Sequence, residues 1–204
     1  MVFSWFKRRR REKLRAAPFP AEHLEILQQN LRHFHLIPES RRDRLLELVR
    51  IFVAEKHWEG CGGLEMTDEV RLTVAGQACV LLLGIEGEYC FDGVKSILVY
   101  PSAYLQAPTW ESDDMVVESK PVTLGESWHR GPIVLSWSHV LEGSRDSDRG
   151  RNLVLHEFAH HLDGLEGFVD GIPPLASRAE QEEWRKVTGR EFHRLVHQAR
   201  DGRA

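Results

Sequence analysis

Apolar residues recur at helical spacing along the first part of the chain, in stretches that are separated by Pro or Gly. In such a stretch, apolar positions three or four apart fall on one side of a helix and face the core. Pro38 separates the first two stretches, and Thr67, followed by two acidic residues, predicts the start of the third. The predicted helices cover residues 21–34, 39 or 40 to about 58, and 67 to about 83.

The period of the pattern changes in the middle of the chain. Runs bounded by Pro or Gly predict strands, which cover residues 94–100, 116–124 and 133–137. A helical turn at 138–141 and a final helix over 176–200 are expected to follow. Helices, then a small mixed sheet, then helices indicate a single α+β domain. The absence of alternating strands and helices disfavours a doubly wound sheet.

The stretch 152–164 carries the most specific chemical signal, the pattern His-Glu-x-x-His among apolar residues. His156 and His160 lie four residues apart, so a helix presents both imidazoles on one face, where they can bind one metal ion. Glu157 is one step further round the helix and can hold a water on that ion without being a ligand. Zinc lowers the pKa of such a water towards about 7, and Glu157 can take its proton as the water attacks a carbonyl group.

Neighbouring positions add detail to this prediction. Asp163 falls on the same face and is expected to accept a hydrogen bond from a ligand imidazole. Gly164 is expected to close the helix in the left-handed conformation. His161 lies off the metal face and is expected to be packed or solvent-facing rather than a ligand. The apolar neighbours predict a mostly buried helix, and the alternative is a partly exposed helix with a solvated polar stripe.

Length and composition restrict the class of protein. A chain of 204 residues suits one domain, and no apolar run reaches the roughly 18 residues of a membrane-spanning helix. Stable membrane insertion is therefore not expected. The cysteines Cys61, Cys79 and Cys90 are odd in number and form no Cys-x-x-Cys pair. This pattern argues against a disulfide framework and a zinc ribbon, and it indicates the reducing cytoplasm.

Positive charge is concentrated at the N-terminus. Residues 1–15 contain seven Lys or Arg and one Glu, whereas the whole chain has a formal net charge of −4. The acidic remainder disfavours direct binding of nucleic acid. Residues 1–20 are expected to form a flexible basic tail ahead of a domain over 21–204, and no secretory signal is expected. The alternative is that Phe3, Trp5 and Phe6, with the basic run, contact an anionic membrane or an acidic partner.

Four parts of the chain carry a further signal: residues 5–10 with 18–20, 63–67, 131–137, and 156–163 with 170–173. Together these segments resemble the Mlc titration factor A family of zinc-dependent peptidases. The resemblance extends from the tail to roughly residue 185, and the combination is more specific than His-Glu-x-x-His alone.

The resemblance implies a zincin-like fold akin to the catalytic domain of anthrax lethal factor, with the His-Glu-x-x-His motif on a central helix. It implies one Zn²⁺ held by His156 and His160, Glu157 as general base, and hydrolysis of peptide or protein substrates, aminopeptidase-like in the enterobacterial member. That member also binds and inactivates the glucose-responsive repressor Mlc, so a transcriptional repressor is an implied partner.

The third zinc ligand is the point at which the sequence departs from the family. In the family this ligand is a glutamate on a later helix, which by spacing would lie beyond Ala204, so the domain is expected to lack its C-terminal helices. Glu180, 20 residues after His160, is a candidate within the chain, as are Glu182, Glu183 and Glu191 on the same predicted helix. The alternative for all four is a solvated charged face.

Three functions remain open from the sequence. The first is a zinc peptidase whose substrate strand pairs with an edge of the sheet, for which 133–137 is a candidate. The second is a non-catalytic protein that binds a repressor and carries an incomplete or vestigial zinc site. The third is an enzyme attached to a membrane surface by the basic aromatic tail.

Overall fold

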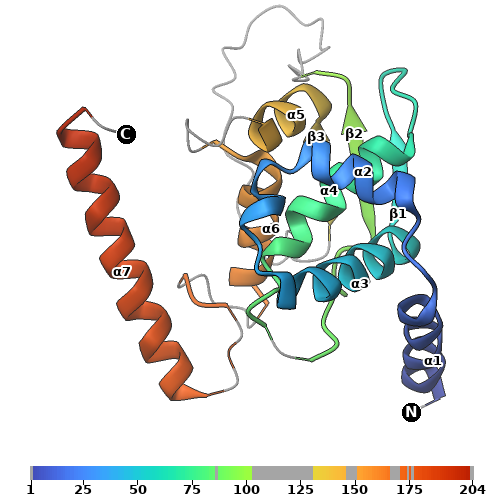
Figure 1. Ribbon diagram of the computed structural model, residues 1–204, viewed down its shortest axis with the longest axis horizontal. Coiled ribbons are helices and arrows are strands. Elements are labelled where there is room, and N and C mark those ends of the chain that lie inside the picture. The colour runs from blue at the N-terminus through green and yellow to red at the C-terminus, as the bar shows by residue number, and fades with distance from the viewer. Residues whose placement is uncertain are drawn as a thin grey trace, which may run out of the picture.

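The structure, a computed structural model, describes residues 2–85, 87–102, 131–145, 151–165, 171–173, 175 and 177–202. It is helix-rich with a small sheet, which confirms the α+β class (Figure 1). In chain order the elements are α1 (Val2–Ala16), α2 (Ala21–Asn30), the 3₁₀ helix η1 (Arg32–Leu36), α3 (Glu39–Glu55), β1 (His57–Gly60), α4 (Asp68–Val80), β2 (Ser96–Tyr100), β3 (Ile133–Ser136), α5 (Trp137–Arg145), α6 (Leu153–Asp163) and α7 (Arg178–Arg200).

The described strands form one sheet in the order β1-β2-β3, and both neighbouring pairs are parallel. In register, Trp58 lies opposite Ile97, and Leu98 lies opposite Val134. The sequence predicts a mixed sheet, whereas every strand pair among the described residues is parallel. The strand expected over 116–124 lies outside these residues.

Because α4 lies between β1 and β2 in the chain, these two parallel strands form a β-α-β unit, as parallel neighbours require a crossover connection. The sequence predicts no such alternation, because its helical pattern continues to about Trp58. In the structure α3 ends at Glu55, and Lys56 takes an extended backbone with φ −89° and ψ 146°. The backbone N–H of His57 then donates to the carbonyl of Lys95 at 2.9 Å, which starts the sheet.

The helices predicted in the first half of the chain are confirmed, with changed ends. The stretch 21–34 is divided into α2 and η1 at Leu31, whose backbone is extended. Thr67 caps α4, and its side chain accepts the N–H of Val70 at 3.3 Å. Helix α4 ends at Val80, before the predicted end near residue 83. The helical turn expected at 138–141 is part of the longer α5.

Helix α4 lies at the centre of the core, where it contacts α2, α3, α5 and α6. Gly76 permits the approach of α2, because a Cβ atom at this position would lie 2.8 Å from side-chain carbons of both Leu27 and Leu31. Helix α3 contributes Val49 and Phe52, both with no exposed surface, as its apolar stripe predicts. Close packing of this kind fixes the elements that carry the candidate site.

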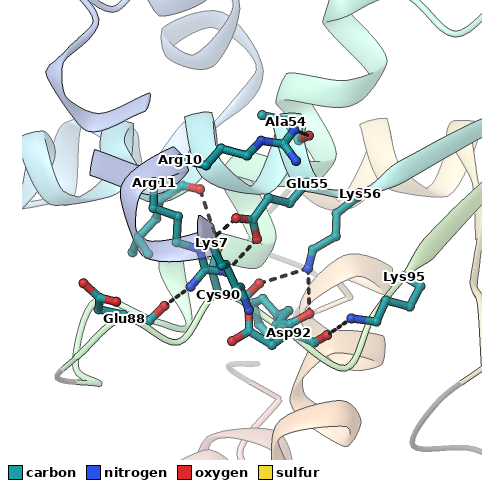
Figure 2. Close-up of polar contacts among 12 residues, drawn as sticks. Lys7, Arg10, Arg11, Ala54, Glu55, Lys56, Glu88, Cys90, Asp92 and Lys95 are labelled. Carbon is teal, nitrogen blue, oxygen red and sulfur yellow. Dashed lines mark hydrogen bonds and ion pairs between the residues drawn. The ribbon is translucent and has the colours of Figure 1, made fainter. Parts of the chain in front are cut away.

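The N-terminal segment is a helix, α1, rather than the flexible tail that the sequence predicts, and it lies against α3. Arg11 anchors it and is only 2% exposed. Its guanidinium donates to both carboxylate oxygens of Glu55, at 2.8 and 2.6 Å, and to Asp92 at 2.5 Å (Figure 2). Arg11 also donates to the backbone carbonyl of Glu88. The basic segment is therefore held by the ion pairs of the buried Arg11 and is not only solvated.

Helix α7 confirms the helix predicted over 176–200 and lies apart from the rest of the molecule in Figure 1. Ser177 and Glu180 form a capping box at its start, and none of its residues is buried. Its large apolar side chains Trp184, Phe192 and Leu195 are exposed. Among the described helices, none has both the length and the apolar character that crossing a membrane requires.

Candidate metal centre

Helix α6 carries the His-Glu-x-x-His motif, and its start is fixed by Asn152. The side-chain oxygen of Asn152 accepts the N–H of Leu155 at 2.8 Å, which satisfies an N–H that the helix itself leaves free. The side-chain amide of Asn152 donates to Gln77 of α4 at 2.7 Å and to the carbonyl of Gly143 in α5 at 3.1 Å. The N-terminal end of the motif helix is therefore tied to two neighbouring helices.

The motif helix has one buried and one exposed face. Val154, Phe158 and Leu162 are buried, and Phe158 packs against the rings of Phe52 and Phe91 with centroid distances of 5.5 and 4.7 Å. The opposite face is open, with His156, Ala159 and His160 all exposed. The mostly buried helix that the apolar neighbours predict is therefore wrong, and the structure matches the alternative of a partly exposed helix, whose open side carries the candidate ligands.

His156 and His160 meet on this open face. The centroids of their rings are 4.5 Å apart, and the ring planes are nearly perpendicular, at 87°. Two imidazoles at this separation on one helix face can direct a nitrogen each to one ion. Glu157 follows His156 on the helix and is partly buried. The structure therefore brings together two of the donors that a catalytic zinc site requires, with a carboxylate beside them.

A third protein ligand is not found in the part of the chain that the structure describes, since no group of three His, Cys, Asp or Glu suited to a metal ion occurs there. Glu180 is engaged elsewhere, because its carboxylate accepts the backbone N–H of Ser177 at 2.9 Å in the capping box of α7. Glu182 pairs with Arg178 at 3.5 Å, and Glu191 pairs with Arg194 at 2.9 Å. These carboxylates agree with the alternative of a solvated charged face.

Asp163 at the end of α6 accepts the backbone N–H of Gly171 at 2.6 Å. This bond attaches the segment after the motif helix to the helix itself. The hydrogen bond that Asp163 is expected to accept from a ligand imidazole stays a prediction. Gly164 has φ −85°, so the expected left-handed closure of the helix is wrong. His161 is packed rather than solvent-facing, with its ring centroid 5.9 Å from that of Phe91.

Sequence reasoning missed two contributors to the site. Gln77 gives no signal in the sequence, because its contact with Asn152 joins positions 75 residues apart. Gly143 allows the start of α6 to approach α5, since a Cβ atom there would lie 2.9 Å from the carbonyl oxygen of Arg151. Asn152, in contrast, can be recognised from the sequence, because an asparagine directly before an apolar helical run is a typical N-cap.

An α+β domain with paired histidines and an adjacent glutamate on one helix has the donor arrangement of metal-dependent hydrolases. The model of the family "glucose-regulated metallo-peptidase M90" matches residues 5–204, so the chain belongs to this family. This finding agrees with the resemblance inferred from the sequence.

Curated relatives agree with the family assignment. The chain is similar to the uncharacterized protein slr2042 of Synechocystis, with 33% identity over 93% of this chain and 69% of that protein. It is similar to Mlc titration factor A of Serratia proteamaculans, with 35% identity over 70% of this chain and 54% of that protein. The corresponding protein of Klebsiella pneumoniae is 36% identical over 71% of this chain and 54% of its own length. The match thus spans about half the length of the Mlc titration factors.

Proposed function

We propose that this protein is a zinc-dependent metallopeptidase, with His156 and His160 as zinc ligands and Glu157 as general base. The observation that carries the proposal is the placement of the two imidazoles, 4.5 Å apart, on the open face of α6. A zinc ion there would supply a Lewis acid that polarises the peptide carbonyl and activates water. The third ligand is assigned to a carboxylate outside the described residues, because catalytic zinc sites use three protein ligands.

Each residue of the motif has a defined task in this proposal. His156 and His160 each present the unprotonated nitrogen of a neutral imidazole to the ion, so the ring proton is on the second nitrogen. The carboxylate of Glu157 orients the attacking water, takes its proton and returns a proton to the leaving amine. Asp163 is proposed to accept a hydrogen bond from the ring N–H of one ligand imidazole. The three free cysteines support a cytoplasmic setting.

The sheet offers a place for the substrate. Among the described strands β3 is an edge, it contacts α6, and its residue Val134 is 52% exposed. An extended peptide that pairs with β3 would gain backbone hydrogen bonds next to the motif helix. The aminopeptidase-like activity that the resemblance implies through the enterobacterial member is proposed for this chain as well. Peptides with an acetylated N-terminus should then be hydrolysed far more slowly than the same peptides with a free amine.

The decisive experiment compares wild-type protein with Glu157→Gln. We expect about one zinc ion per chain in both proteins, and a loss of peptide hydrolysis of about 100-fold or more in the variant. Glu182→Gln on α7 is the matched control and should keep full activity. Equal hydrolysis by wild type and Glu157→Gln would reject the proposal.

A second function is favoured by the names of two of these relatives, which are called Mlc titration factor A. We propose that this chain also binds a repressor of the Mlc type, in agreement with the family description as glucose-regulated. Binding of purified Mlc should be measured for wild type, His156→Ala and Glu157→Gln. Binding that persists in both variants would separate this role from hydrolysis, whereas binding that requires the intact motif would reject a purely binding role.

A further inference from the structure

A second group of charged side chains surrounds a cleft on the N-terminal side of the molecule, distinct from α6. The cleft has a volume of about 380 Å³ and lies between α1, the end of α3 and the segment before β2 (Figure 2). Four cationic side chains line it together with two carboxylates: Lys7, Arg10, Lys56, Lys95, Glu55 and Asp92. Phe6 and Val94 supply apolar wall. The charge balance of this cleft determines what it can bind.

The two carboxylates are already neutralised. Glu55 receives two hydrogen bonds from Arg11, and Asp92 receives one from Arg11 and an ion pair from Lys7 at 2.9 Å. Burial acts to raise the pKa of Glu55, but the hydrogen bond and charge of Arg11 outweigh this effect and hold the pKa below its ordinary value. Both groups therefore stay ionised and bound, and neither is left to compensate a further cation.

Three cations of the cleft have no carboxylate partner among the described residues. Arg10 donates to the carbonyl of Ala54 at 2.9 Å, and Lys95 donates to that of Asp92 at 2.7 Å. Lys56 donates to the carbonyls of Cys90 and Phe91, at 3.0 and 2.6 Å. Carbonyl dipoles solvate these cations but do not cancel their charge, so the cleft keeps a positive excess.

Lys56 is the most informative of the three, because it is only 8% exposed. An ammonium group has three N–H donors, and two of them are used by the carbonyls. Burial lowers the pKa of Lys56, although Cys90, Asp92 and Glu55 act in the opposite direction. A buried cation without a bound anion is costly, so an anion that completes its shell would be bound favourably.

We propose that this cleft binds the phosphate group of a phosphate monoester through Arg10, Lys56 and Lys95. A phosphate monoester carries about −1.5 to −2 charges at neutral pH and three strong acceptor oxygens, which match three separate cationic donors. Phe6 and Val94 can contact an organic substituent on the phosphate. The phosphate can belong to a free molecule or to a lipid headgroup, since the neighbouring Trp5 and Phe6 are 53% and 60% exposed, as expected of residues at a bilayer interface.

The test measures binding of three probes to the full chain, at an ionic strength that screens electrostatic interactions beyond about 10 Å. The probes are inorganic phosphate, glycerol 3-phosphate, and vesicles of phosphatidic acid compared with vesicles of phosphatidylcholine. The double variant Arg10→Met/Lys95→Met removes two donors and leaves the buried Lys56 intact. The matched control Arg9→Met/Lys13→Met removes the same charge from exposed positions of α1 that do not line the cleft.

We expect the Arg10/Lys95 variant to lose affinity by about tenfold or more, and the control to change it by no more than about twofold. Binding of the soluble phosphates alone would assign a free ligand, and cleft-dependent binding of phosphatidic acid vesicles alone would assign a lipid headgroup. Either outcome supports the proposal. Absence of binding to all probes, or equal losses in the two double variants, would overturn it.

Discussion

The rings of Phe91 and Phe158 meet edge to face, with their centroids 4.7 Å apart. Phe158 is the buried residue of the motif helix that lies between His156 and His160 in sequence, and Phe91 precedes β2. The backbone carbonyl of Phe91 accepts the hydrogen bond from Lys56. Phe91 therefore contacts both Lys56, which lines the proposed phosphate cleft, and Phe158 on the helix of the proposed zinc site, so packing links the two sites.

Phe91 also has an unusual backbone conformation, with a φ of 49°. Among the described residues it is the one non-glycine residue with a positive φ. This left-handed conformation costs an L-residue roughly 1–2 kcal/mol. We expect Phe91→Gly to be more stable than Phe91→Ala by about 1 kcal/mol, although both lose about 3–5 kcal/mol of ring packing. Urea unfolding of the two variants measures the difference.

The matched control for this prediction is Phe52, which is equally buried but lies inside α3. In a helix interior Ala is favoured over Gly by about 1 kcal/mol, so Phe52→Ala should be more stable than Phe52→Gly. The two sites should therefore rank the same pair of substitutions in opposite order. The same order at both sites would contradict a left-handed backbone at Phe91.

Removal of either candidate ligand tests the metal centre directly. Loss of a residue that only hydrogen-bonds to a zinc ligand typically weakens zinc binding about 10–100-fold. His156→Ala and His160→Ala should each weaken zinc binding by more than this, because each removes a ligand. Titration of metal-free protein with zinc in a calorimeter gives the affinities. His193→Ala, on exposed α7, is the control and should bind zinc as the wild type does. Unchanged zinc affinity in the two motif variants would show that the metal, if bound, is bound elsewhere.

The parts of the fold that follow local patterns could be predicted from the sequence. The apolar stripe of α3, with Val49 and Phe52, and the N-cap Thr67 both depend on residues within a few positions of one another. The spacing of His156 and His160 is of the same kind, since helix geometry alone brings them to one face. These elements were predictable because each depends on short-range spacing along one helix.

The parts that could not be predicted depend on distant partners. Arg11 looks like any other residue of a basic run, and its partners Glu55 and Asp92 are 44 and 81 residues away. The open face of α6 was only the alternative prediction, because an apolar residue such as Ala159 suggests burial, whereas Ala159 is exposed in the structure. Strand β1 was missed because the predicted helix continues to about Trp58, which includes the first two residues of the strand.

The anchoring of α1 should depend on pH through its buried charge pairs. Burial acts to raise the pKa values of Glu55 and Asp92. Arg11 holds the pKa of Glu55 below its ordinary value, and Lys7 together with Arg11 does the same for Asp92. A carboxyl group whose pKa is lower in the folded state than in the unfolded state stabilises the fold above the unfolded-state pKa of about 4. This stabilisation is lost as the pH falls through the lower folded-state pKa. The free energy of unfolding should therefore decrease below about pH 4.

Arg11→Met should remove the part of this pH dependence that comes from Glu55, whereas Lys7 still pairs with Asp92. The variant should cost about 3–5 kcal/mol at neutral pH, because it leaves the largely buried carboxylate of Glu55 without its partner. Arg8→Met on the same helix is the control, since Arg8 is 67% exposed and its pair with Glu12 should contribute no more than about 1 kcal/mol. Urea unfolding at several pH values compares the three proteins. Similar losses in the two variants would mean that Arg11 is not the anchor.

Helix α7 should respond to local substitutions without changing the core, because none of its residues is buried. Gly189 lies in its interior, and a Cβ atom there would meet no atom within 4 Å, so Gly189→Ala should stabilise the helix by about 1 kcal/mol. Ser177→Ala removes the capping box and should destabilise the helix by a similar amount. Amide hydrogen exchange within α7 should slow in the first variant and accelerate in the second, each by about fivefold. Exchange in α4 should stay constant in both. If both variants instead shift exchange in α4 and α7 together, α7 unfolds with the core, and its exposed Trp184, Phe192 and Leu195 must then be in contact with it.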